Sequence, residues 1–173
     1  MNDSILTSWS ETLGVRIEER RLAGDRCGIY YDPLRLIILD ERLAGFQRRC
    51  TLCHELIHAR HHDPGCGSQY GIKCERRCRR ETALALISPV DYGMAETVYE
   101  GNTWMMAVEL GVTIQVLNDY RQLLYDSGVC VQELYAFIRV YRALYPFGFL
   151  IKKDPDHPHT ASAGVKNMWE EAP

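Results

Sequence analysis

The sequence predicts an α+β fold: a small three-stranded antiparallel sheet packed on an H-E-x-x-H helix, with a helical C-terminal region. Three observations lead to this prediction. Short alternating and apolar runs lie between residues 15 and 39, an apolar helical pattern follows over residues 44–59, and helical patterns continue from residue 73 to residue 144. With 173 residues, 46% of them hydrophobic and 25% charged, the chain suits one compact domain with a small appendage.

One helix and three strands are expected first. Apolar residues on one helical face predict a helix over residues 4–13, which Gly14 ends. Runs at residues 15–17, 27–31 and 34–39, separated by Gly-Asp and Asp-Pro turns, predict three strands. These strands together make the expected antiparallel sheet.

The rest of the chain is expected to be helical. The first helix after the sheet stops at Asp63-Pro64-Gly65, and a second one ends at Ser88-Pro89, because the residue before a proline disfavours helical geometry. The polar tail from residue 152 lacks apolar periodicity, so we expect it to be loosely ordered. The helices expected after the sheet cover residues 44–59, 73–87, 90–96, 104–110, 114–125 and 131–144.

Charge and hydropathy exclude several classes of protein. The formal net charge of −3 makes nucleic acid an unlikely ligand for the molecule as a whole. The start of the chain lacks a basic segment followed by an apolar run, and no stretch approaches the ~18 apolar residues that cross a membrane. We therefore expect a cytoplasmic protein, whose seven cysteines lack the spacing of a disulfide framework and stay reduced.

The strongest chemical signal is the H-E-x-x-H motif formed by His54, Glu55 and His58. At 100° per residue, His58 lies about 40° round the helix from His54, so both imidazoles can bind one zinc ion. Glu55 projects beside this pair, where its carboxylate can act as the base toward a zinc-activated water. The alternative is an exposed helix that carries two histidines without a function. The apolar neighbours of the motif indicate a buried helix instead, and polar histidines on a buried helix require a partner such as a metal ion.

A catalytic zinc ion needs a third protein ligand and an open position for water. The helix expected at residues 73–87 offers Glu75 and Glu81, and the motif alone does not choose between them. A similarity to a known family that extends beyond the motif favours Glu75.

Residues 50–63 and 75–89 resemble the ImmA/IrrE metallopeptidases of phages, prophages and mobile elements. The similarity rests on Thr-Leu-Cys-His-Glu-Leu-Ile-His at residues 51–58 and on a later helix that begins at Glu75 and ends in Leu-Ile-Ser-Pro, and it covers roughly residues 5–145. It implies a gluzincin-like zinc endopeptidase with one Zn²⁺, held by His54, His58 and Glu75, and with Glu55 as the catalytic base. It also implies a protein substrate, such as a phage or mobile-element repressor.

The chain departs from the family pattern at Arg79. Many relatives have an acid at this position, where it can orient a ligating histidine. From the resemblance we expect a metallopeptidase core at residues 1–100, a helical, helix-turn-helix-like subdomain at residues 101–151 and a flexible tail at residues 152–173.

Other signals leave alternatives open. The pairs Cys50/Cys53 and Cys74/Cys78 resemble halves of a structural zinc site. Residues 107–117 resemble a helix-turn-helix, so a transcription-linked DNA- or protein-binding module with a structural zinc and no catalysis is the alternative function. A metal-free interaction protein of the same fold is a third hypothesis. The basic run at residues 76–80 is either a solvated helix face or a surface for an acidic substrate segment.

Overall fold

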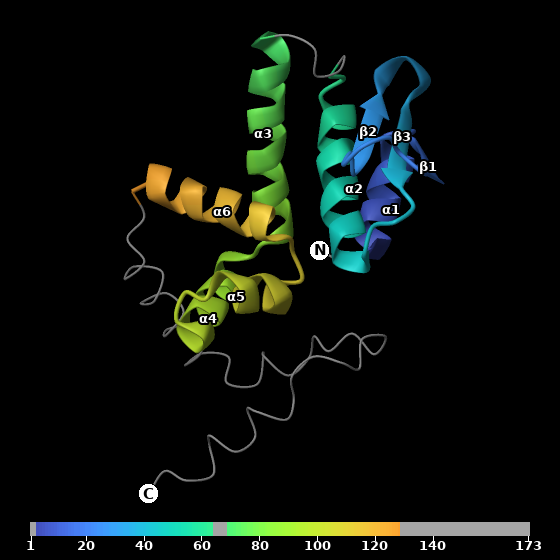
Figure 1. Cartoon of the computed structure of the whole chain (residues 1–173). Helices are drawn as coiled ribbons and strands as arrows, with labels where there is room; N and C mark the ends of the chain where they lie inside the picture. Colours follow the sequence, from blue (N-terminus) through green and yellow to red (C-terminus); the bar gives the residue numbers. More distant parts are fainter. Residues whose placement is uncertain (1–2, 64–68, 129–173) are drawn as a thin grey trace, which may run out of the picture.

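The computed structural model describes residues 3–63 and 69–128, which form one three-stranded sheet and six α-helices (Figure 1). The N-terminal elements are α1 (Asp3–Thr12), β1 (Arg16–Arg20), β2 (Gly28–Tyr31), the 3-10 turn η1 (Asp32–Leu34) and β3 (Leu36–Asp40). The later helices are α2 (Gly45–Arg60), α3 (Gln69–Leu86), α4 (Pro89–Tyr99), α5 (Thr103–Leu110) and α6 (Ile114–Asp126). The predicted α+β class is confirmed, whereas the helix expected at residues 131–144 and the tail lie outside the described residues.

The sheet is mixed, so the prediction of a purely antiparallel sheet was wrong for one of its pairings. The strand order is β1-β3-β2, with β3 antiparallel to β2 and parallel to β1. The segment between β1 and β2 crosses the end of β3, so the chain enters the sheet again on the far side of the central strand. As a result β2 forms the edge of the sheet beside α2.

Asp40, at the end of β3, anchors the crossing segment. Its carboxylate accepts hydrogen bonds from the backbone N–H of Leu22 at 2.8 Å and from the Arg42 side chain at 2.7 and 2.8 Å. The N–H of Asp40 donates to the carbonyl of Cys27 at 2.8 Å. The Arg42 hydrogen bond is the main reason why the pKa of this buried carboxyl lies well below its usual range. Asp40 thus fixes both ends of the connection that makes the sheet mixed, the Leu22 end through its side chain and the Cys27 end through its backbone.

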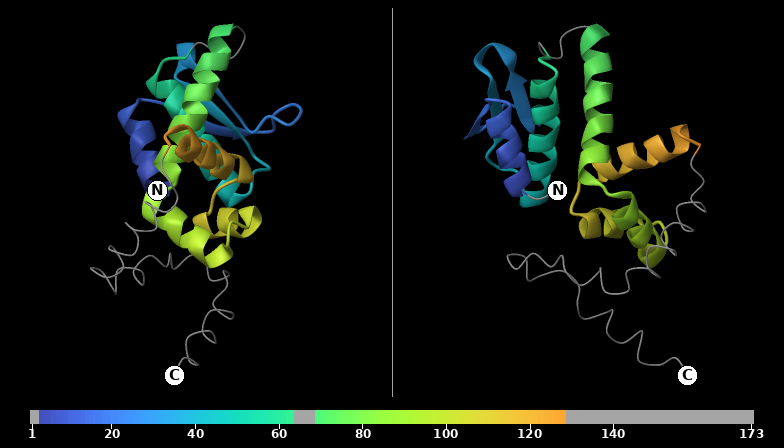
Figure 2. Two further views of the ribbon diagram at one scale, coloured as in Figure 1. Left: turned by 90° about the vertical axis from the view of Figure 1, so that its left-hand side faces the viewer. Right: turned by 180° about the vertical axis from the view of Figure 1, so that it is seen from behind.

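α2 is the central element of the molecule. It lies between the sheet and α3, while α1 covers another part of its surface (Figures 1 and 2). Leu52, Leu56 and Ile57 of α2 are each at most 3% exposed and join Ile37 and Leu39 of β3 in one core. Full burial of an apolar side chain of this size stabilises a protein by about 1.5–3 kcal/mol. Contacts on several sides therefore hold α2 in place.

The C-terminal helices are fastened to this centre at two points. α6 crosses α3 (Figure 1), and Arg79 of α3 donates two hydrogen bonds to Asp119 of α6, at 3.0 and 2.6 Å. Gly111 ends α5 in the left-handed conformation, with φ 60°, and its carbonyl accepts a hydrogen bond from Arg49 of α2. Thr113 then caps α6. The expected turn between two helices is present, and the division of the chain at residue 100 stays a prediction.

None of the helices in residues 3–63 and 69–128 has the length and apolar character needed to cross a membrane.

The pair between Arg79 and Asp119 predicts a measurable coupling between α3 and α6. Arg79→Ala and Asp119→Ala should each lower the free energy of unfolding by about 1 kcal/mol, because the pair is bidentate and one partner is largely buried. Urea unfolding of both single variants and the double variant measures the coupling. Strictly additive losses would contradict the pairing.

Candidate metal centre

α2 and α3 pack side by side and bring three polar side chains together. His54 and His58 lie one turn apart on α2, and their Nε2 atoms are 3.1 Å apart. Glu75 of α3 faces both, with its carboxylate oxygens 3.4 Å from His54 Nε2 and 3.4 Å from His58 Nε2. The side chains predicted as metal ligands are thus neighbours, and their role as ligands stays a prediction.

The spacing of these atoms suits a single metal ion. Three ligand atoms about 2.0–2.1 Å from a tetrahedral ion lie roughly 3.3 Å from one another. Here the two Nε2 atoms are 3.1 Å apart, and each lies 3.4 Å from a different carboxylate oxygen of Glu75. Two imidazoles and one carboxylate are a common donor set of catalytic zinc sites. The Glu75 side chain is 43% exposed, so solvent reaches the group from that side.

The electrostatics of the group also favour a cation. Hydrogen bonds from His54 and His58 hold the pKa of Glu75 well below its usual range. Burial acts to lower the pKa of His58, but hydrogen bonds with Cys78, Glu75 and Asp63 outweigh it and raise this pKa to about 11. An ionised Glu75 and the acceptors around His58 therefore stabilise positive charge between the two helices.

Asp63 orients His58 from behind. Its Oδ2 lies 2.9 Å from His58 Nδ1, and the side chain is 5% exposed. Arg77 of α3 donates to both carboxylate oxygens at 2.7 Å. Burial opposes ionisation of Asp63, but the bonds with Arg77 and His58 lower its pKa to about 2. With an ionised acceptor at Nδ1, His58 keeps its proton there and turns Nε2 toward Glu75.

Sequence reasoning missed Asp63 as a partner of the site. His62 adopts the left-handed conformation, with φ 54°, and the N–H of Asp63 then donates to the carbonyl of His58 at 3.1 Å. This reversal returns the chain beside the last turn of α2. The only local signal was an acid directly after the motif helix, which by itself also fits a simple helix stop.

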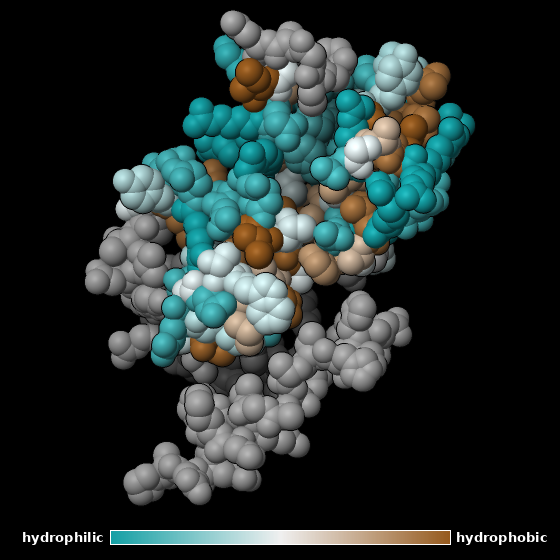
Figure 3. Space-filling model, viewed as in Figure 1, coloured by the Kyte–Doolittle hydropathy of each residue, from teal (hydrophilic) through white to brown (hydrophobic). Residues whose placement is uncertain are grey.

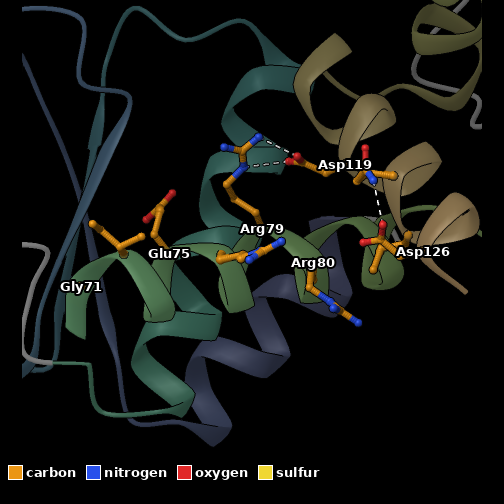
Figure 4. Close-up of a pocket in the computed structure, with 10 residues that line it drawn as sticks. Gly71, Glu75, Arg79, Arg80, Asp119 and Asp126 are labelled. Atoms are coloured by element: carbon orange, nitrogen blue, oxygen red, sulfur yellow. Dashed lines mark hydrogen bonds and ion pairs between the residues drawn. The ribbon is translucent and has the colours of Figure 1, made fainter. Parts of the chain in front are cut away.

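Arg79 does not take part in this arrangement. It stands where the family resemblance implies an orienting acid, but its guanidinium points to Asp119 of α6 (Figure 4). Asp63 supplies an orienting carboxylate from the opposite end of the site.

Glu55 lies in the wall between α2 and β2. It is 7% exposed, and the backbone of Tyr30 is hydrogen-bonded to it. Burial raises the pKa of Glu55, while His54 and His58 act to lower it.

A Cβ at Gly28 of β2 would lie 2.6 Å from Thr51 Cγ2 and 3.1 Å from Glu55 Cγ. The close approach of β2 to Glu55 therefore requires glycine at position 28, a requirement that the sequence pattern did not reveal.

The alternative glutamate is engaged elsewhere. Glu81 accepts hydrogen bonds from Arg60 at 2.5 Å and pairs with His61 at 3.1 Å. In residues 3–63 and 69–128, the groups that could hold a metal are His54/His58/Glu75 and His58/Asp63/Cys78, and neither includes Glu81.

The rival four-cysteine site does not form among the described residues. No metal-holding group there combines the cysteines of α2 with those of α3. Burial raises the pKa of Cys53 to about 12 and also raises that of Cys50, although hydrogen bonds with Thr113 act to lower the latter. Both thiols thus stay protonated and pack as small apolar groups.

The helix-turn-helix segment offers little to DNA. Arg121 is the one cation within α6, and it donates to Thr103 at 2.7 Å and to the carbonyl of Gly101 at 3.0 Å. A recognition helix needs cations that face phosphate groups. The alternative function as a DNA-binding module therefore gains no support from α6.

Comparison with known proteins finds a family match. The model of the Peptidase M78 family, described as the IrrE N-terminal-like domain, matches residues 10–118. This stretch runs from α1 into α6 and includes Glu55 and the three clustered side chains. No curated protein and no solved structure matches the chain.

Loss of the orienting carboxylate should weaken metal binding. We expect Asp63→Asn to lower the affinity for Zn²⁺ by about 10- to 100-fold, because His58 loses the partner that fixes its tautomer. Competition with a chromogenic chelator measures the change, and Glu81→Gln serves as the control. Equal affinities for Asp63→Asn and the wild type would contradict the orienting role.

The contact at Gly28 predicts a packing defect. Gly28→Ala should lower the free energy of unfolding by about 1–3 kcal/mol, since its methyl group meets Thr51. Thr51→Ala in the same chain removes the clashing Cγ2 and should restore part of the loss. Gly45→Ala is the control, because a Cβ there has no atom within 4 Å. An unaltered midpoint in urea for Gly28→Ala would rule out this close approach.

Proposed function

The chain belongs to the ImmA/IrrE peptidase family, whose IrrE N-terminal-like domain matches residues 10–118, and from this premise we propose a zinc-dependent endopeptidase that acts in the cytoplasm on a regulatory protein. A repressor of a phage or mobile element is the proposed substrate. Membership establishes a metallopeptidase-type function and a protein substrate. The observation that carries the proposal further is the spacing of 3.1–3.4 Å among His54, His58 and Glu75.

In this proposal His54, His58 and Glu75 hold the zinc ion, and Glu55 handles the proton. A zinc ion held there would supply Lewis-acid chemistry, which polarises a peptide carbonyl and lowers the pKa of a bound water toward ~7. Glu55 accepts the proton of that water and later delivers it to the leaving amine. Burial raises the pKa of Glu55, which makes it a stronger base than an exposed glutamate. Arg77 and Asp63 keep His58 in place during both steps.

The sheet edge supports an extended substrate. β2 pairs with β3 on one side only, and in the described part of the chain no strand covers its other side. Backbone groups on such an edge can bind an extended peptide as an added strand. Because Gly28 and Tyr30 of β2 lie beside Glu55, a peptide bound there passes close to the base.

The metal content of variants tests the proposed ligands. Elemental analysis should find one zinc ion per chain in the wild type and in Glu81→Ala, and a loss of zinc in His58→Ala and Glu75→Ala. Zinc retained in all four proteins would refute the proposed ligands.

Cleavage tests the proposed base. Glu55→Gln should keep its zinc but lose about 10²- to 10⁴-fold in the rate of cleavage of candidate repressors, because it lacks a proton acceptor. Gel assays with purified, zinc-loaded proteins measure this loss. Cleavage by Glu55→Gln at the wild-type rate would exclude this role for Glu55.

A further inference from the structure

A pocket of about 570 Å³ lies between α3 and α6, directly beside the metal centre (Figure 4). Glu75, the proposed ligand on α3, forms part of its wall. The proposed reaction uses the carboxylate of Glu75 and none of the other side chains that line this pocket. Its charged lining residues are Glu75, Arg76, Arg79, Arg80, Asp119 and Asp126.

Two of the pocket's cations have no ion-pair partner in the described part of the chain. Arg79 is paired with Asp119. Asp126 accepts a hydrogen bond from Gln122 at 2.8 Å. Arg76 and Arg80 are exposed, and no ion pair engages either of them within residues 3–63 and 69–128. The pocket therefore carries available positive charge one helical turn from the metal centre.

The same charge continues along the exposed face of α3. Lys73 joins Arg76 and Arg80 in the lining of a neighbouring hollow of about 490 Å³. These three residues are spaced i, i+3 and i+7, which places them on one helix face. Glu81, the acid of this hollow, is already bound by Arg60 and His61. The surface over α3 is hydrophilic in Figure 3, and we name Lys73, Arg76 and Arg80 the basic stripe.

We propose that the basic stripe binds an acidic segment of the protein substrate and so selects which peptide bond reaches the metal centre. This inference rests on the proposed peptidase function, because it concerns the substrate of the same site. Arg80 follows Glu75 by five residues, which is about 7.5 Å along the helix axis and about 140° round it, so a bound peptide has to curve over α3 to reach the stripe. An extended peptide advances about 3.3 Å per residue. With the path round the helix included, the preferred acidic residue lies about three to five residues from the cleaved bond.

The surroundings of the stripe favour a protein over a nucleic acid. Ile72 and Leu84 border the two hollows and are 72% and 59% exposed, so they offer apolar contacts to neighbouring substrate side chains. Asp126 on the facing wall disfavours a chain with a negative charge at every unit, such as a phosphate backbone, whereas a peptide can place an apolar residue there. A segment that mixes acidic and apolar side chains fits both features.

Cleavage preference is the first test. A peptide library made from a whole proteome is treated with the zinc-loaded enzyme, and mass spectrometry identifies the cleaved bonds. We expect Asp and Glu to be enriched about three to five residues from the cut. The triple variant Lys73→Gln/Arg76→Gln/Arg80→Gln should lose this enrichment, whereas Arg16→Gln/Arg21→Gln/Arg26→Gln, which removes three exposed charges elsewhere, should keep it.

Binding without cleavage is the second test. A fluorescein-labelled peptide of alternating Glu and Leu is titrated with zinc-loaded Glu55→Gln, and fluorescence anisotropy is recorded. The stripe variant, made in the same background, should bind about tenfold more weakly, because three weak charge contacts are lost. A peptide with Gln in place of Glu should bind both proteins equally. A single-stranded oligonucleotide of similar length tests the other class of partner.

The outcomes separate this inference from the proposed function. Cleavage with no acidic preference, or with a preference that the stripe variant keeps, overturns the inference and leaves the peptidase intact. Weaker peptide binding by the stripe variant, with no cleavage by the wild type, supports the stripe and refutes the peptidase. Oligonucleotide binding that exceeds peptide binding and is lost in the stripe variant overturns the inference in favour of nucleic acid.

Discussion

The burial of α2 is the constraint on which the rest of the structure depends. A helix enclosed by a sheet on one side and α3 on the other can carry two histidines and a glutamate only if each polar group finds a partner. His58 is hydrogen-bonded to Asp63, which Arg77 binds in turn, and Glu55 is hydrogen-bonded to the backbone of Tyr30. The same contacts that make burial possible also fix the direction in which each side chain points, so packing and the geometry of the site have one cause.

Within the described residues, local sequence patterns were enough to predict the helices, because apolar residues recur along each of them with the helical period. They were not enough for the sheet. The parallel pairing of β1 with β3 joins residues 20 positions apart, and the connection that follows β1 is held by a hydrogen bond from Leu22 to Asp40, 18 positions away. Short strands with similar runs do not encode the partner they choose. The order of the strands therefore had to come from the three-dimensional structure.

The residues of the site also fall into those that the sequence predicted and those that only the folded structure revealed. His54, Glu55 and His58 were predictable because a fixed helical spacing places them together, and Glu75 followed from the family resemblance. Asp63, Arg77 and Gly28 were not, because each acts through a contact that exists only after folding. Asp63 reaches His58 after the chain reverses at His62, and Gly28 matters only where β2 meets α2. Arg79 departs from the family pattern in the sequence. In the structure its hydrogen bond to Asp119 links α3 to α6.

The crowding at Gly28 also restricts how such a chain can diverge. A methyl group at position 28 would collide first with Cγ2 of Thr51, and only then crowd Glu55. A lineage that exchanges Thr51 for a smaller residue opens space for alanine at position 28, whereas the reverse order passes through a destabilised intermediate. The two positions are therefore epistatic, and the order in which they mutate decides whether alanine at position 28 is reached without a destabilised intermediate.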